Sequence, residues 1–433
     1  MSVLDDPVGG PAGNPLVRAL RGVPAQERAA FGPADRAAPP VKWIPSAVAV
    51  LLAALLLWGI SRVAPATTVG TGALGLALGF TLFHSRFGFT SGWRQLVAVG
   101  QGAAIRAHMV MLGVATVLFG VIFATGIGLS GDPKGYVSPV GIGLVVGAFL
   151  FGVGMQIGGS CASGTLFAVG SGQSAIVLTL IGFIVGSVFA ALSFPFWNDV
   201  VPQGPSISLI DVFGGVPGAV AASLLVLAVI TGATYWVARR RNPPPVERPP
   251  SARGIARVLR GSWPLWVGAI VLAVLNAAVL FVSGQPWGVT SAFGLWGAKV
   301  LQWFGAEPQN WAFWQQPANA KSLAGPVLAD RISVLDLGIM IGALVASAVG
   351  GAFMLHKRIP WKIAVGAVFG GILMGYGARL AGGCNIGAYF SGIASFSLHG
   401  WIWGVVALAG TWVGLRLRPL FGHTNPKPAD SIC

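Results

Sequence analysis

The sequence predicts an all-α, polytopic membrane protein with about ten transmembrane helices, arranged as an inverted-topology repeat. Of its 433 residues, 55% are apolar and 9% are charged, and the mean hydropathy is +0.76. Residues 135–198 contain no Asp, Glu, Lys, Arg or His. A soluble domain cannot bury so long an uncharged stretch, whereas a bilayer can. A third observation, two matching patterns of glycine and cysteine, predicts the duplication.

Apolar runs define the membrane spans. Glycine rather than charge interrupts these runs, as expected where helices pack closely through small residues. Several runs are shorter than the roughly 20 residues of a straight crossing, so we also expect short re-entrant glycine-rich helices. The candidate spans are residues 43–60, 68–83, 105–127, 140–157, 175–194, 219–237, 265–282, 337–354, 363–380 and 401–415.

Polar segments predict the domain organisation. The first segment is rich in Pro, Gly, Ala and Arg and lacks the apolar core of a signal peptide, so we interpret it as a disordered tail. A segment with seven arginines and three consecutive prolines divides the chain near its middle. The expected parts are a cytoplasmic tail (1–43), a first membrane half (44–238, with its repeat at about 68–194), a basic cytoplasmic linker (239–262), a second membrane half with the second repeat (263–419) and a C-terminal tail (420–433).

Charge placement predicts the orientation. With ten crossings and a cytoplasmic amino terminus, all four groups of basic residues fall on the cytoplasmic side, together with the carboxyl terminus. Asp199 and Asp211 fall outside. The net charge of +15 is therefore assigned to loops facing anionic lipid, and no nucleic-acid partner is expected. The basic groups are Arg86, Arg94 and Arg106; residues 239–260; Lys357, Arg358 and Lys362; and Arg416, Arg418 and Lys427.

Two cysteines occupy the same glycine pattern, which indicates an internal duplication. Relative to Cys161 and to Cys384, glycine recurs at positions −18, −14, −9, −7, −2 and +3, and phenylalanine at +6. The predicted span before Cys161 runs inward and the one before Cys384 runs outward, so the duplication is inverted. The matched glycines are Gly143, Gly147, Gly152, Gly154, Gly159 and Gly164 in the first copy, and Gly366, Gly370, Gly375, Gly377, Gly382 and Gly387 in the second.

A weaker pair of motifs supports the duplication, since residues 87–91 and 287–291 share Gly, Thr and Ser in register. Inverted repeats are common in transporters, whose substrate path lies near the bilayer midplane between the repeats. Broken, glycine-rich backbone is tolerated at that depth where it is buried in protein or lines a cavity. Residues 158–164 and 382–387 fit this description.

The chemistry of a thiol restricts what such a path would carry. The chain has three cysteines, one of them the terminal Cys433, and no CxxC, so neither a disulfide framework nor a zinc site is expected. A neutral thiol is a weak hydrogen-bond donor with a polarizable sulfur. It suits a large, soft, sulfur-containing anion, and weak contacts favour release as well as binding.

Three segments resemble the signatures of the YeeE/YedE family, bacterial inner-membrane proteins of the sulfur-transport type. They are MQIGGSCASG (155–164), RLAGGCNIG (379–387) and SGIASFSLHGW (391–401). The resemblance covers about residues 70–419 and implies uptake of thiosulfate or a related sulfur species. It further implies an hourglass-shaped inverted repeat whose thiols, here Cys161 and Cys384, hydrogen-bond the passing anion. The chain length resembles a longer YedE-like branch associated with selenium metabolism.

One departure from the family pattern leaves the substrate open. The thiosulfate transporters carry a further cysteine in the early motif of the first half, where this chain reads RFGFT (86–90). Thiosulfate, sulfite and selenium species therefore all remain candidates. The resemblance also implies a small TusA-like sulfur carrier as a cytoplasmic partner.

Other residues near the cysteines are candidates for the substrate pathway. Arg379 is included because an arginine inside a span is a functional-site hypothesis by default, although it could also pair with a neighbour. Gln156 is its repeat equivalent, and Asn385 follows the second cysteine; both could instead satisfy backbone groups. The full candidate set is Cys161, Cys384, Gly159, Gly164, Gly382, Gly383, Gly387, Asn385, Gln156 and Arg379.

Two alternatives to transport remain. One is a membrane thiol-redox or persulfide-handling protein, against which stand the absence of CxxC and of a neighbouring base. The other is a non-transporting membrane subunit that docks a sulfur carrier. We expect a transporter or channel rather than an enzyme, with no cofactor and no metal.

Overall fold

The computed structural model describes residues 39–243, 254–355 and 358–427. Most of the predicted N-terminal tail, part of the basic linker and Cys433 lie outside the described residues. Within these ranges the structure is helical, and ten helices are long and apolar enough to cross a membrane. The predicted number of spans and the helical fold class are therefore confirmed.

The ten long helices lie close to the predicted ranges. They are α3 (Trp43–Val63), α4 (Ala66–Ser85), α6 (Ala103–Thr125), α7 (Ile142–Ile157), α9 (Ser174–Leu192), α11 (Val216–Arg241), α13 (Leu265–Ser283), α17 (Arg331–Val349), α18 (Trp361–Leu380) and α20 (Leu398–Leu417).

Shorter helical segments connect or continue the long helices. They are α5 (Phe89–Val99), α8 (Ala162–Gly170), η1 (Phe196–Val200), α10 (Leu209–Val212), η2 (Gly254–Ala256), α12 (Arg257–Arg260), α14 (Thr290–Trp303), η3 (Pro308–Asn310), α15 (Ala312–Gln315), α16 (Pro317–Ala324), η4 (Val327–Ala329), η5 (Asn385–Ser391), α19 (Gly392–Ala394) and η6 (Arg418–Phe421).

One helix begins well before its predicted start. We expected a span over 337–354, whereas α17 covers Arg331–Val349. The prediction was wrong because it avoided the charged residues at the start of this segment. The Asp330 side chain accepts a hydrogen bond of 2.8 Å from the Ser333 backbone N–H, so the acidic residue caps the helix.

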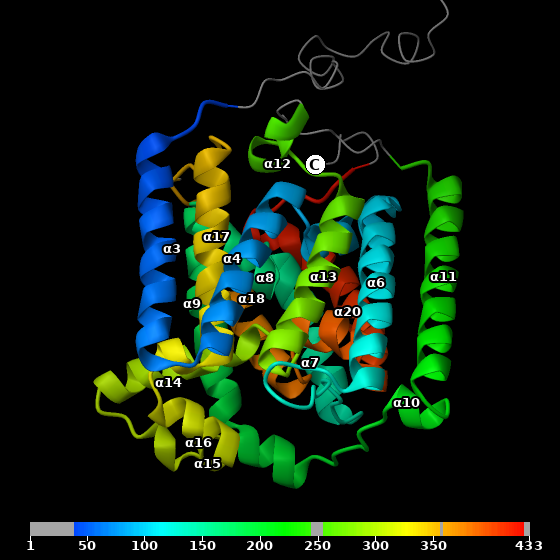
Figure 1. The fold of residues 1–433 in the computed structure, drawn as a ribbon. Helices are drawn as coiled ribbons and strands as arrows, with labels where there is room; N and C mark the ends of the chain where they lie inside the picture. The colour runs from blue at the N-terminus through cyan, green and yellow to red at the C-terminus, as the bar shows by residue number, and fades with distance from the viewer. Residues whose placement is uncertain (1–38, 244–253, 356–357, 428–433) are drawn as a thin grey trace, which may run out of the picture.

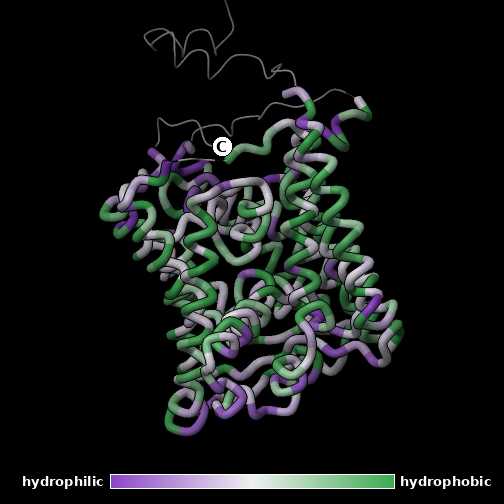
Figure 2. Tube along the Cα trace, turned by 90° about the vertical axis from the view of Figure 1, so that its left-hand side faces the viewer, coloured by the Kyte–Doolittle hydropathy of each residue, from purple (hydrophilic) through white to green (hydrophobic). Residues whose placement is uncertain are grey.

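Apolar side chains cover the outside of the helix bundle. α3 and α11 lie at its two edges in Figure 1, and their exposed residues include Trp43 (79% exposed) and Leu225 (67%). Hydrophilic residues gather mainly at the two ends of the molecule in Figure 2. This distribution is that of a protein solvated by lipid around its middle.

Glycines bring the interior helices into backbone contact. α7 and α18 cross where Gly147 faces the Gly377 carbonyl and Gly154 faces the Gly370 carbonyl. The two helices therefore run in opposite directions. Glycine contacts also join α4 to α17, α9 to α18 and α7 to α20, while α6 packs against α13.

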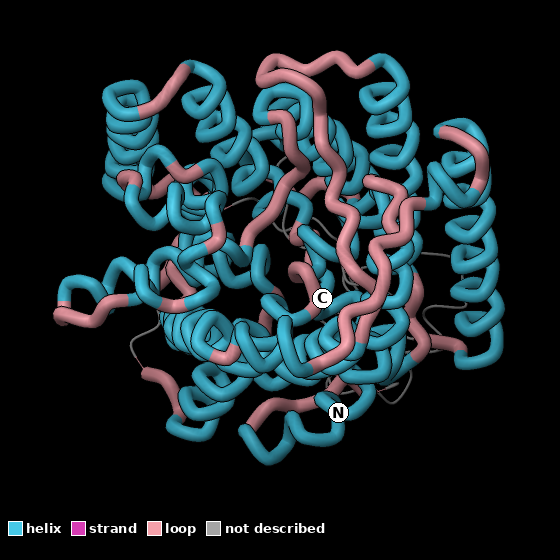
Figure 3. The backbone as a smooth tube through the Cα atoms, turned by 90° about the horizontal axis from the view of Figure 1, so that it is seen from below, coloured by secondary structure: helices cyan, strands magenta, loops and turns pink. Residues whose placement is uncertain are grey.

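Loops cross one end of the bundle. They appear over the face seen in Figure 3. Isolated antiparallel bridges join Pro139 to Ser206 and Ser208 to Ser397, which ties the loop after α9 both to the segment before α7 and to the segment before α20.

Candidate functional site

Both cysteines begin a short helix after a break in the chain. α7 ends at Ile157, and Cys161 is the N-cap residue of α8. α18 ends at Leu380, and Cys384 is the N-cap residue of η5. The two cysteines have similar extended backbones, with φ and ψ of −91° and −174° at Cys161 and −107° and −165° at Cys384. The repeated sequence pattern thus produces a repeated local structure.

Glycine permits the backbone conformations found at these two breaks. Gly159 has φ of +80°, and Gly382 and Gly383 have φ of +67° and +140°. L-residues with a Cβ rarely adopt such conformations. These three pathway candidates therefore shape the turns that present the cysteines.

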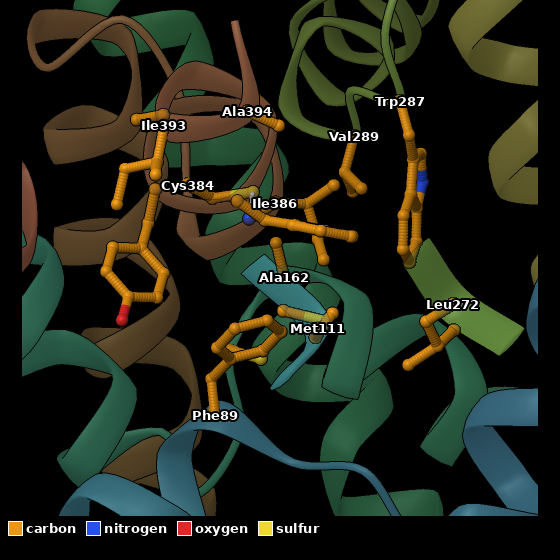
Figure 4. Close-up of a cluster of buried hydrophobic side chains, with 14 of the residues drawn as sticks. Phe89, Met111, Ala162, Leu272, Trp287, Val289, Cys384, Ile386, Ile393 and Ala394 are labelled. Carbon is orange, nitrogen blue, oxygen red and sulfur yellow. Dashed lines mark hydrogen bonds between the residues drawn. The ribbon is translucent and has the colours of Figure 1, made fainter. Parts of the chain in front are cut away.

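The two thiols lie in one buried cluster. Cys161 is 1% exposed and Cys384 is fully buried, and both belong to the main hydrophobic cluster of the protein. α8 contacts η5, which brings the two short helices together. In Figure 4, Cys384 and Ile386 lie next to Ala162, the residue after Cys161. Residues more than 200 positions apart in the chain thus form one centre.

The weaker sequence motifs reach the same centre. Phe89 follows the break after α4, while Trp287 and Val289 follow the end of α13. All three are buried in the cluster, and Figure 4 shows them around Ile386 and Ala162 together with Met111 of α6. Four interrupted segments therefore converge. The early motif RFGFT (86–90) thus contributes the apolar Phe89 side chain to this centre.

The immediate contacts of the thiols are weak and polar. The Cys161 sulfur lies 3.8 Å from the Ser163 hydroxyl, and the Cys384 sulfur accepts from the Ile386 backbone N–H at 3.4 Å. A Cβ at Gly164 would collide with the Ser160 hydroxyl and lie 3.2 Å from the Cys161 sulfur. At Gly387, by contrast, a Cβ would meet no atom within 4 Å. Gly164 therefore leaves room for the Cys161 thiol, whereas Gly387 borders open space.

Asn385 is a polar side chain without a protein partner. It is fully buried, and neither its amide nitrogen nor its amide oxygen has a hydrogen-bond partner among the described residues. Buried polar groups are nearly always hydrogen-bonded, so such an exception calls for an explanation. Its position directly after Cys384 makes it available to a ligand at the second thiol.

Gln156 and Arg379 make equivalent contacts away from the sulfur atoms. The Gln156 side-chain amide donates to the Thr90 carbonyl at 3.2 Å, and Arg379 donates to the Ser291 carbonyl at 3.0 Å. The Arg379 guanidinium also lies 4.9 Å above the Phe313 ring of α15. Its described contacts are thus with α14 and α15. Both side chains hold the neighbouring broken segments in place.

An acidic residue was missed by the sequence analysis. Asp336 of α17 is fully buried, and neither carboxylate oxygen has a partner among the described residues. It lies one turn beyond Ser333, whose hydroxyl accepts from the Trp296 indole of α14 at 3.0 Å. An ionisable residue within an apolar stretch was the signal that would have found it.

Replacement of Asp336 tests how much the burial of its carboxylate lowers the stability of the folded protein. We expect Asp336→Asn to raise the melting temperature of the purified protein at pH 8, because an unpaired buried carboxylate is destabilising by several kcal/mol. Asp330→Ala on the same helix is the control, and it should lower the melting temperature by removing a cap worth about 1 kcal/mol. A lower melting temperature for Asp336→Asn would show that the carboxylate is stabilised.

Fold and site together define a multi-pass helical membrane protein with two free thiols at its buried centre. The chain belongs to the sulphur transport family, whose sequence profile matches residues 84–413. This match confirms the family resemblance drawn from the cysteine motifs.

Individual relatives are similar over different lengths. The chain is 34% identical over 161 residues to the probable transporter YedE of Salmonella typhimurium, covering 37% of this chain and 39% of that protein. It is 26% identical over 371 residues to the thiosulfate transporter TsuA of Spirochaeta thermophila, covering 79% of this chain and 97% of that protein. The TsuA protein of Escherichia coli is 26% identical over 348 residues, covering 78% and 91%. The chain thus aligns with about two fifths of the YedE relatives and nearly all of the TsuA relatives.

Proposed function

We propose that this protein is a transporter or channel for uptake of a sulfur-containing anion, thiosulfate or a related sulfur or selenium species. The observation that carries the proposal is the meeting of two buried thiols, each at the start of a short helix, in one cluster. The names of the TsuA relatives support thiosulfate as the first substrate to test.

The chemistry of the centre fits transient binding of such an anion. Neutral thiols donate weak hydrogen bonds and present a polarizable sulfur, so the ligand is held without being trapped. The unpartnered Asn385 amide adds a stronger donor beside the second thiol. Apolar residues around the thiols exclude competing water, which strengthens these contacts.

We further propose that the two halves form an inverted repeat. The cysteine frame makes Gly147 the counterpart of Gly370, and Gly154 the counterpart of Gly377. Where α7 and α18 cross, Gly147 faces Gly377 and Gly154 faces Gly370. A two-fold axis between the halves produces such reciprocal contacts. Their antiparallel crossing also supports opposite directions through the membrane.

Packing between the halves supports the same relation. In the proposed repeat, α4 corresponds to α13, α6 to α17, α7 to α18 and α9 to α20. The contact of α4 with α17 then corresponds to that of α13 with α6, and the contact of α9 with α18 to that of α20 with α7. The equivalent contacts of Gln156 and Arg379 with the motifs after α4 and α13 follow the same pattern. In this arrangement the path lies between the repeats, near the midplane.

We propose that the face carrying the basic groups is cytoplasmic. The described ends of the chain lie at this face (Figure 1). Arg241 donates to the Val97 carbonyl, the Trp263 N–H donates to the His84 carbonyl, and Lys362 lies beside Gly422. Because α5 also packs on α20, the described residues of the four groups lie at one end of the molecule, which supports an orientation that satisfies the positive-inside rule. A TusA-like carrier is the partner that the family resemblance implies there.

Uptake of labelled anions tests the proposed function. We expect bacterial cells that lack other sulfur importers to accumulate radiolabelled thiosulfate when they express this chain, at least about tenfold above vector-only cells. Sulfite and selenium analogues, added as competitors, define the selectivity. If none of the anions accumulates while the protein is present in the membrane, the transport proposal is wrong.

The redox alternative makes a different prediction. Both cysteines are free in the described structure, and permeation requires no change in their oxidation state. Counting free thiols in active protein after mild oxidation separates the two functions. A disulfide between Cys161 and Cys384 in protein that still transports would contradict simple permeation.

A further inference from the structure

Basic side chains gather where α7 ends. Arg418, at the end of α20, donates to the Gln156 carbonyl at 2.6 Å. The His423 ring lies beside the backbone at Ile157. Arg94 lies on α5, which packs against both α20 and α7. Two segments that are distant in the sequence therefore place basic side chains around one helix end.

Among the described residues, Arg94, Arg418 and His423 have no acidic ion-pair partner, so the charges of the two arginines are not balanced there. Arg418 is only 6% exposed, and its two terminal nitrogens donate to the carbonyls of Gln156 and Thr424. Its buried Nε has no partner. A buried donor on a cation, next to a second cation, favours binding of an anion.

The cluster adjoins the loop that leads to the first thiol. A Cβ at Gly159 would lie 3.8 Å from the His423 ring. Gly159 precedes Cys161 by two residues. The buried Thr90 hydroxyl also has no partner in the described part of the chain, and the Thr90 carbonyl accepts from the Gln156 side chain. A free hydroxyl donor therefore lies beside the end of α7.

We infer that Arg94, Arg418 and His423 form a second anion-binding site, beside the 158–160 loop, which takes a small dianion passing to or from Cys161. The identity of the dianion, thiosulfate, rests on the proposed function. Bound charge relieves the repulsion between the two guanidinium groups, whose planar N–H donors match the oxygens of such an anion. The site recognises charge and oxygen atoms, whereas the thiols select for sulfur.

The protonation state of His423 fits this role. Burial, together with the neighbouring Arg418 charge, lowers the pKa of His423. The imidazole is therefore neutral at neutral pH and contributes one N–H donor rather than a third fixed charge. Two fixed positive charges match the two charges of the anion.

Equilibrium binding to a thiol-free variant isolates this site. Purified Cys161→Ala/Cys384→Ala protein is titrated with radiolabelled thiosulfate, with sulfate and chloride as competitors. We expect this variant to retain some thiosulfate binding. Sulfate should displace the bound thiosulfate, whereas chloride at the same concentration should not. Adding Arg94→Gln should weaken this binding about tenfold, the loss typical of one charge-assisted hydrogen bond. His423→Gln should weaken it less.

Arg416→Gln is the matched control. Arg416 lies two residues from Arg418 but is exposed and stacks on the Trp412 ring at 3.2 Å. Its replacement removes the same charge outside the cluster and should change binding less than twofold. Melting temperatures of all variants show whether they remain folded. Arg418 itself is left intact because its loss also uncaps two backbone carbonyls.

The outcomes separate this inference from the proposed function. If Arg94→Gln and His423→Gln bind thiosulfate as Arg416→Gln does, the second site is refuted even where wild-type protein transports. If wild-type protein fails to transport but sulfate-sensitive binding is lost with Arg94→Gln, the site stands and the transport proposal falls.

Discussion

Removal of both buried thiols is expected to reduce thiosulfate uptake about hundredfold. Each thiol is placed at the start of a short helix in one cluster, and each contributes a weak hydrogen bond to the passing anion. A net contact of about 1 to 1.5 kcal/mol corresponds to roughly tenfold in rate, and two contacts along one path multiply. The measurement is initial uptake of radiolabelled thiosulfate by Cys161→Ala, by Cys384→Ala and by the double variant.

The third cysteine is the natural control. Cys433→Ser changes a thiol outside the two repeated glycine patterns and should leave uptake unchanged. Cys161→Ser and Cys384→Ser retain a small hydrogen-bond donor but lose the polarizable sulfur, so each should transport at a rate between wild type and the alanine variant. If the double alanine variant accumulates thiosulfate as wild type does, the thiols do not carry the anion.

Replacement of Gly154 by valine is expected to prevent stable folding. A Cβ at this position would already lie 2.6 Å from the Gly370 carbonyl oxygen, at the crossing of α7 and α18. Valine adds two further methyl groups, and separating the helices is destabilising by about 3 kcal/mol. The crossing also precedes the loop that carries Cys161, so uptake should fall with stability. Thermal unfolding and size-exclusion chromatography in detergent measure the effect.

Gly232→Val is the matched control for this substitution. Gly232 lies in α11, where a Cβ would meet no atom within 4 Å. Both changes place the same β-branched residue in a helix, so the difference between them reports packing alone. Equal melting temperatures for the two variants would show that α7 and α18 do not cross as closely as described.

Hydropathy predicts the helices of this protein but not the contacts between their side chains. Ten spans are predicted from hydropathy, since apolar runs of bilayer length are a local property of the chain. α17 begins at Arg331 rather than at residue 337, and it includes the charged residues Arg331 and Asp336. A capping aspartate before the first turn was the signal that would have corrected this error.

For the candidate site, too, spacing along the chain predicts which residues are equivalent but not which neighbours their side chains contact. Equal glycine spacing identified Cys161 and Cys384 as equivalent positions, and the structure gives both the same extended N-cap backbone. For Arg379 the sequence left open a place beside the path or pairing with a neighbour, and its described partners are the Ser291 carbonyl and the Phe313 ring. Which neighbour a long side chain reaches depends on helix packing, which no local pattern encodes.

The sequence by itself determined the solvent, the number of spans, the family and the pairing of two thiols in a repeated frame. These properties depend on composition and on spacing along the chain, which are local or periodic. Only the tertiary structure decided that the thiols share one cluster and that Arg418 reaches the end of α7, 262 residues earlier in the chain. It also decided that the buried side chains of Asn385 and Asp336 have no partner among the described residues. The physical reason is that burial and hydrogen bonding are set by residues brought together from distant helices, so they exist only once the helices pack.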